Sequence, residues 1–162
     1  MTTLVQKFLP LVRRAIARVE ALQPLALLAA RLYVAQAFFL SGLTKLRDWD
    51  TTLALFADEY KVPLLPPELA AALGTGGELV LPVLLAFGLA GRFAAAGLSV
   101  MNVVAVISLA EIAPAALQQH QFWGSLLVGL LLWGPGRWSL DALLAPRLAG
   151  EPQGLQKAAR LA

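Results

Sequence analysis

Long apolar stretches separated by short polar breaks dominate the pattern of this chain. They cover about residues 24–45, 68–89, 93–112 and 121–133. A helix needs roughly 20 mostly apolar residues to cross a bilayer. The pattern therefore predicts an all-α fold, in which a four-helix transmembrane bundle occupies residues 24–145.

The first 23 residues follow a different pattern. Apolar residues from Leu4 to Leu22 fall on one helical stripe, while Lys7, Arg14 and Arg18 lie mostly off it. This favours a basic amphipathic helix over residues 1–23, lying at the membrane interface. A cleaved signal peptide is the alternative. The basic residues are interspersed and no small-residue cleavage site follows an apolar core, so we expect the segment to be retained.

Proline, glycine and aspartate mark the breaks between the apolar stretches. Asp50 is a candidate cap for a short surface helix that extends to Tyr60. The three prolines between Lys61 and Pro67 would end that helix and begin the next. Residues 146–162 carry prolines and glycines, which predicts a short, partly disordered cytoplasmic tail.

Composition supports a membrane protein and excludes several kinds of chemistry. Of the 162 residues, 59% are hydrophobic and 14% charged, and the mean hydropathy is +0.71, unlike an ordinary soluble domain. The chain has no cysteine, which excludes disulfides, thiolate metal sites and thiol redox chemistry by its own side chains. It has one histidine, His120, which excludes a bis-histidine haem within one chain.

The distribution of basic residues predicts the orientation of the chain. Lysine and arginine are enriched in the cytoplasmic segments of membrane proteins. Both ends of this chain are basic, so we expect a multi-pass inner-membrane protein with both termini in the cytoplasm. The net charge of +3 does not indicate nucleic acid, because these residues would meet anionic lipid. The basic end residues are Lys7, Arg13, Arg14, Arg18, Arg137, Arg147, Lys157 and Arg160.

Four residues with a charged or amide side chain lie in the interior of the apolar stretches, where a charge costs about 2.5–3.5 kcal/mol. Counting along each span places Gln36, Glu78 and Asn102 near one depth, with Arg31 within reach of Glu78. One interpretation is a structural Arg31–Glu78 ion pair that fixes helix register. The other is a buried polar cluster that binds a polar head group or exchanges protons with it.

A second polar cluster is expected on the outer side, at the ends of the spans. It comprises Lys45, Glu111, His120 and Trp123. These residues are either interfacial side chains that reach water or a proton relay built on His120 beside a carboxylate. A metal site is not expected, because most sites need three or four ligands.

The order of several short motifs resembles the DoxX family over roughly residues 25–145. The motifs are Arg31, Ser41-Gly-Leu-Thr-Lys45, Gly77-Glu78, Gly88-Leu-Ala-Gly-Arg92 and Gly136-Arg-Trp-Ser-Leu-Asp141. The resemblance implies a small four-helix membrane protein. It also implies an association with redox complexes, since the family takes its name from a membrane subunit linked to thiosulfate–quinone oxidoreduction.

The function that we expect is a redox-associated membrane subunit that binds a quinone or similar head group in its bundle. Two alternatives remain open at the level of sequence. One is a non-catalytic scaffold that anchors a partner protein, and the other is a small transporter or metal-handling subunit. The partners expected are the lipid bilayer, a soluble or membrane redox protein and further copies of the chain. The sequence does not decide whether the protein is an enzyme.

Overall fold

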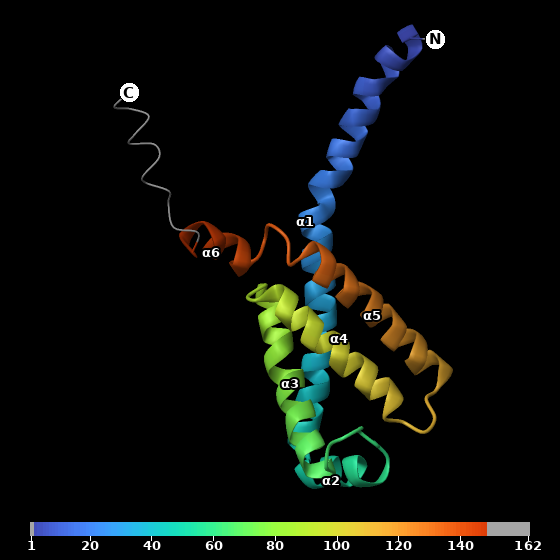
Figure 1. Cartoon of the computed structure of the whole chain (residues 1–162), viewed down its shortest axis with the longest axis vertical. Helices are drawn as coiled ribbons and strands as arrows, with labels where there is room; N and C mark the ends of the chain where they lie inside the picture. The colour runs from blue at the N-terminus through green and yellow to red at the C-terminus, as the bar shows by residue number, and fades with distance from the viewer. Residues whose placement is uncertain (1, 149–162) are drawn as a thin grey trace.

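The computed structural model describes residues 2–148, with side chains for residues 8–147. Within that range the chain forms six α-helices and no strand, which confirms the all-α prediction (Figure 1). The helices are α1 (Thr2–Arg47), α2 (Trp49–Asp58), α3 (Pro67–Phe87), α4 (Gly91–Ile107), α5 (Pro114–Trp133) and α6 (Leu140–Leu148).

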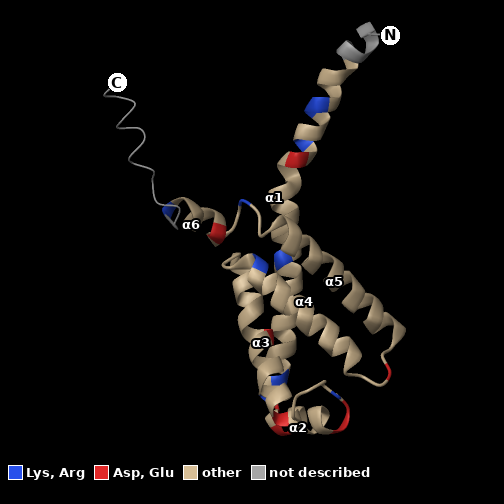
Figure 2. Ribbon diagram, viewed as in Figure 1, with Lys and Arg blue, Asp and Glu red and all other residues tan. Residues whose placement is uncertain are grey.

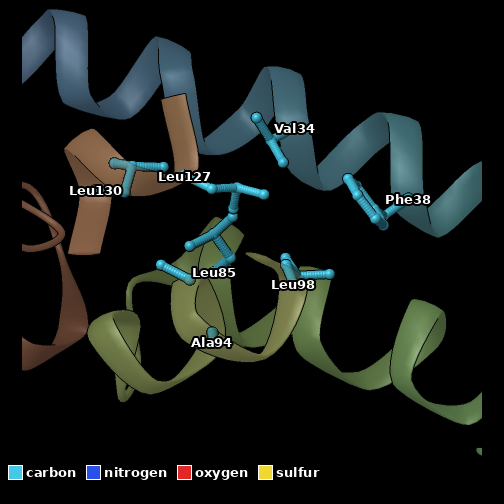
Figure 3. Close-up of a cluster of buried hydrophobic side chains, with 8 residues drawn as sticks. Val34, Phe38, Leu85, Ala94, Leu98, Leu127 and Leu130 are labelled. Carbon is cyan, nitrogen blue, oxygen red and sulfur yellow. The ribbon is translucent and has the colours of Figure 1, made fainter. Parts of the chain in front are cut away.

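The bundle consists of α3, α4, α5 and the C-terminal part of α1. Helix α1 packs mainly along α3, and α4 packs against both α3 and α5. The N-terminal part of α1 projects beyond the bundle (Figure 1). One apolar core joins all four helices (Figure 3). Its buried members are Val34 and Phe38 of α1, Leu85 of α3, Ala94, Ala95 and Leu98 of α4, and Leu127 and Leu130 of α5.

The outside of this bundle is apolar, as expected for a protein surrounded by lipid. Many large hydrophobic side chains are exposed, among them Val80, Val100 and Leu132. Among the described residues, two helical segments are long and apolar enough to cross a membrane, Phe8–Arg47 and Pro67–Phe87. Figure 2 shows few charged residues along the bundle helices. That α4 and α5 also cross the membrane stays a prediction.

Helix α1 continues through residue 23, where we expected one helix to end and the first span to begin. A separate N-terminal helix followed by a first span was predicted, but one helix of 46 residues runs through both, with Pro10 and Pro24 inside it. A proline removes one backbone hydrogen bond and strains the preceding turn, yet a helix can continue on both sides of it. Strong helix formers surround Pro24 here. The membrane-surface position of residues 1–23 stays a prediction.

Helix α2 begins at a different cap from the one predicted. Asp48, not Asp50, precedes the helix, and its carboxylate accepts hydrogen bonds from the Thr51 N–H (3.0 Å) and the Thr51 hydroxyl (2.7 Å). Asp50 lies inside the first turn. The helix ends at Asp58, two residues before Tyr60. These two hydrogen bonds lower the pKa of the Asp48 carboxyl below its ordinary value.

We expect replacement of Asp48 by alanine to fray α2, because the Thr51 N–H loses its partner. Amide hydrogen exchange in α2 should accelerate, whereas Asp58→Ala at the other end should change it little. Because folding lowers the pKa of Asp48, the cap contributes stability above about pH 3.9, the ordinary value for Asp. That contribution is lost as the pH falls through the lower folded value. Equal exchange in the two variants would contradict this role.

The described part of the C-terminal region ends in a short helix. Residues 140–148 form α6, so regular structure extends three residues into the segment that was predicted to be a partly disordered tail. Asp141 lies in the first turn of this helix, where a negative charge is favourable. The rest of the predicted tail, residues 149–162, lies outside the described residues.

Candidate functional site

A cavity of about 500 Å³ opens among α1, α2, α3, α4 and α5. Most of its lining is apolar, including Phe38, Met101 and Leu73. A few polar side chains interrupt that lining: Ser41 and Lys45 from α1, Tyr60 from the loop after α2, Glu78 from α3, Ser108 after α4, and His120 and Trp123 from α5. An apolar cavity with a few convergent polar groups is the usual form of a small-molecule site.

Lys45 and Glu78 form an ion pair in this cavity. The Lys45 Nζ lies 2.5 Å from the Glu78 Oε2, and it also donates a hydrogen bond of 3.0 Å to the Ser41 hydroxyl. The two charged side chains are only 18% and 14% exposed. Gly42 lets α1 approach α3 at this level, since a Cβ there would lie 3.0 Å from the Glu78 Cβ. The pair is therefore held by closely packed backbones.

The prediction of an ion pair between Arg31 and Glu78 is wrong, because Glu78 pairs with Lys45. Arg31 is fully buried and instead donates to two backbone carbonyls, those of Ala86 (3.3 Å from Nη1) and Trp138. Helices α1 and α3 run antiparallel, so Arg31 meets the end of α3. Glu78 lies about 12 Å further along α3, at 1.5 Å per residue. Lys45 is the basic residue of α1 at that level.

Asn102 holds His120, a residue of the cavity wall, through two hydrogen bonds. The Asn102 Nδ2 donates to the His120 backbone carbonyl (2.9 Å), and its Oδ1 lies 2.8 Å from the His120 Nδ1. Since an amide oxygen only accepts, the Nδ1 must carry the proton. In a neutral ring the Nε2 is then a free acceptor. Trp123 packs edge-on against His120, with ring centroids 5.2 Å apart.

Residues from the two polar clusters predicted from the sequence come together in one site. Glu78 from the first predicted cluster joins Lys45, His120 and Trp123 from the second in one cavity, and Asn102 holds His120. Besides Asn102, three of the predicted residues, Arg31, Gln36 and Glu111, do not line the cavity. Gln36 and Glu111 are both exposed.

Three polar lining residues were not among the predicted site residues: Ser41, Tyr60 and Ser108. Ser41 precedes Lys45 by four residues, and this helical spacing places both on one face of α1. Tyr60 comes from the loop after α2 and packs edge-on against Phe56 at 5.1 Å. Burial, together with the negative charges of Glu59 and Glu78, raises the pKa of Tyr60, so its hydroxyl stays protonated at neutral pH.

A second polar network closes the opposite end of the bundle. The Asp141 carboxylate accepts hydrogen bonds of 2.8 Å from the backbone N–H groups of Ala90 and Gly91, at the start of α4. Its own N–H donates to the Gly88 carbonyl (3.0 Å). Gly88 has a φ of 64°, and a Cβ there would overlap the Arg31 guanidinium. Arg31, Gly88 and Asp141 therefore join α1, α3, α4 and α6 at this end of the bundle, and we refer to this network as the structural lock.

The described residues do not gather a metal site. No group of three or more His, Cys, Asp or Glu side chains comes together in residues 8–147. The charged and titratable groups in the lining include one carboxylate (Glu78), one imidazole (His120) and one ammonium group (Lys45). The ammonium group forms an ion pair with the carboxylate.

Comparison with known proteins identifies relatives of the chain. The model of the DoxX family matches residues 26–111, which run from α1 to the loop after α4. An uncharacterized protein of Haemophilus influenzae is 30% identical over 128 residues, which cover 74% of this chain and 83% of that protein. No solved structure matches the chain.

Proposed function

Because this chain belongs to the DoxX family, we propose that it is a membrane subunit whose cavity binds the head group of a quinone or a similar lipid-soluble molecule. The family and the apolar helices indicate a membrane protein. The observation that carries the proposal is the Lys45–Glu78 pair in the wall of an otherwise apolar cavity of about 500 Å³.

The polar groups suit a ring that carries oxygen atoms. The Lys45 ammonium has three protons, of which Ser41 and Glu78 take two. The third is left to donate to a carbonyl oxygen of the ligand. The apolar lining would hold the ring and the start of its tail. Glu78 and the His120 Nε2 can accept hydrogen bonds from the hydroxyl groups of the reduced form.

Reduction of a quinone to a quinol takes two electrons and two protons. This chain has no cysteine to hold an iron–sulfur cluster, so we propose that a partner protein or a second bound cofactor supplies the electrons. The role of the chain itself is to bind the ring and move protons. Glu78 and His120 are the lining residues that we propose as proton carriers.

We also propose the inner membrane as the location, with both termini in the cytoplasm. Support comes from the basic residues near both ends of the chain. The structural lock of Arg31 and Asp141 would then lie toward the cytoplasm, and the cavity would lie toward the outer side.

Tryptophan fluorescence offers a direct test with a short-tailed ubiquinone analogue as the probe. Trp123 lines the cavity, so binding should quench it, and Trp123→Phe should remove most of the quenching. Trp133→Phe is the matched control, because Trp133 is 67% exposed and outside this cavity. Glu78→Gln should weaken binding by about tenfold, which corresponds to about 1.4 kcal/mol for one altered polar contact.

Glu68→Gln is the control for that substitution, since Glu68 is an exposed carboxylate in the first turn of the same helix. Quenching that is unchanged in Trp123→Phe and Glu78→Gln would overturn the proposed site. A folded protein that shows no quenching and co-purifies with a soluble protein would support the scaffold alternative. Glu111 does not line the cavity with Lys45 and His120, so it does not add support to the transporter alternative.

A further inference from the structure

Gln36 lies in the middle of an apolar helix and on the side that faces away from the bundle. It is exposed, and about 14–18 Å of helix separate it from each end of the predicted first span, at 1.5 Å per residue. If α1 crosses the membrane, this amide lies near the bilayer midplane. Polar side chains at that depth normally face other protein segments and pair with polar groups there.

The exposed face around Gln36 has the spacing of a helix-pairing seam. Leu22, Leu25, Ala29, Leu32 and Gln36 alternate in steps of three and four residues, and all five are exposed. That spacing is the a and d pattern of a heptad repeat. The buried residues of the same helix, such as Arg31, Val34 and Phe38, point to the opposite side.

The same register continues into the part of α1 that projects beyond the bundle (Figure 1). Phe8, Leu11 and Ala15 follow the seam upstream, and all three are exposed. Arg18 takes the d position between Ala15 and Leu22, outside the predicted span, where its long side chain can extend to water. Both prolines of α1, Pro10 and Pro24, fall at the c position of this repeat and so lie off the seam. The seam from Phe8 to Gln36 is about 42 Å long, and within one copy of the described chain no other helix covers it.

We propose that α1 pairs with α1 of a second copy of this chain, in parallel, along the seam from Phe8 to Gln36. Two copies inserted in the same orientation present identical seams to each other. The Gln36 amide both donates and accepts, so two such groups related by a twofold axis satisfy each other. A polar residue at one a position of a heptad also fixes register and the number of strands. Ala15 and Ala29 let the two backbones come close.

The absence of cysteine from the chain permits a clean disulfide test in membranes. Ala29→Cys on the seam should form a covalent dimer under mild oxidation, because a disulfide needs Cα atoms about 4.4–6.8 Å apart. Val83→Cys is the control, since Val83 is 41% exposed on α3 and off the seam. Equal crosslinking of the two variants, or none in either, would overturn the proposal.

The second measurement is energy transfer between labelled copies in vesicles at increasing lipid dilution. Gln36→Leu should weaken dimerisation by about threefold to fifteenfold, the range for one hydrogen bond between helices in a membrane. Gln118→Leu is the control, an exposed amide in α5 and away from the seam. Unchanged dimerisation in Gln36→Leu would overturn the pairing of the two amides. Neither test depends on whether the cavity binds a quinone.

Discussion

Replacement of Arg31 by methionine is expected to lower the free energy of unfolding by about 3–5 kcal/mol, because it removes two hydrogen bonds from a buried charged group. The carbonyls of Ala86 and Trp138 would lose their donor inside the bundle. Asp141 would lose the buried positive charge beside it. The end of α3, the start of α4 and the loop before α6 would all lose a shared anchor.

Thermal unfolding in detergent micelles measures this effect. Arg92→Met is the matched control, because Arg92 is exposed and, among the described residues, donates one hydrogen bond, to the Leu132 carbonyl (3.2 Å). Arg31→Lys should fall between the wild type and Arg31→Met, since a lysine keeps the charge but not the two-pronged geometry. Equal stability losses in Arg31→Met and Arg92→Met would refute the proposed role of Arg31 as an anchor of the structural lock.

The second large effect is expected at the ion pair in the cavity. Lys45→Met leaves the Glu78 carboxylate largely buried without its partner, and breaking such a pair costs about 3–5 kcal/mol. Both side chains retain some exposure, so we expect the lower end of that range. The double variant Lys45→Met/Glu78→Met should be more stable than Lys45→Met alone, because no unpaired charge remains.

A double-mutant cycle of Lys45→Met and Glu78→Met quantifies this coupling. If the two residues did not interact, their effects would add, and the double variant would be the least stable of the set. Arg31→Met combined with Glu78→Met provides the comparison. Those two effects should be additive, because Arg31 and Glu78 make no direct contact.

Much of the fold followed from the hydrophobic pattern. The apolar stretches predicted α3 almost to the residue, because Pro66 and Pro67 fix its start and Gly88 its end. Helix α5 begins seven residues earlier than expected. Its first turns carry Gln118, Gln119 and Gln121, and these polar residues interrupt the apolar pattern from which the helix was predicted. A helix end set by proline or glycine can be predicted, whereas one inside a mixed polar segment cannot.

The site was harder to predict, because it depends on which residues face each other. Depth along a span placed Arg31 near Glu78, but the antiparallel packing of α1 on α3 brings Lys45 there instead. Hydropathy gives each span its length, and it does not give the rotation of one helix against the next. The same limit explains Gln36, which has the right depth for the cluster and the wrong face.

The motifs that suggested the family serve two different purposes in the structure. Arg31, Gly88 and Asp141 build the lock at one end of the bundle. Lys45 and Glu78 line the cavity toward the other end. The former group maintains the fold, and we propose that the latter group contacts a ligand. Substitutions in the lock should therefore lower stability, whereas Glu78→Gln is expected to weaken binding in a protein that still folds.

Native mass spectrometry of the protein in nanodiscs, with extraction and identification of bound small molecules, tests the central claim most directly. We predict a quinone or a related lipid-soluble ring in the wild-type protein and in Glu68→Gln. Its occupancy should fall sharply in Glu78→Gln, with the protein still folded. A wild-type protein that carries no such molecule from its native membrane, or equal occupancy in Glu78→Gln, would contradict the account.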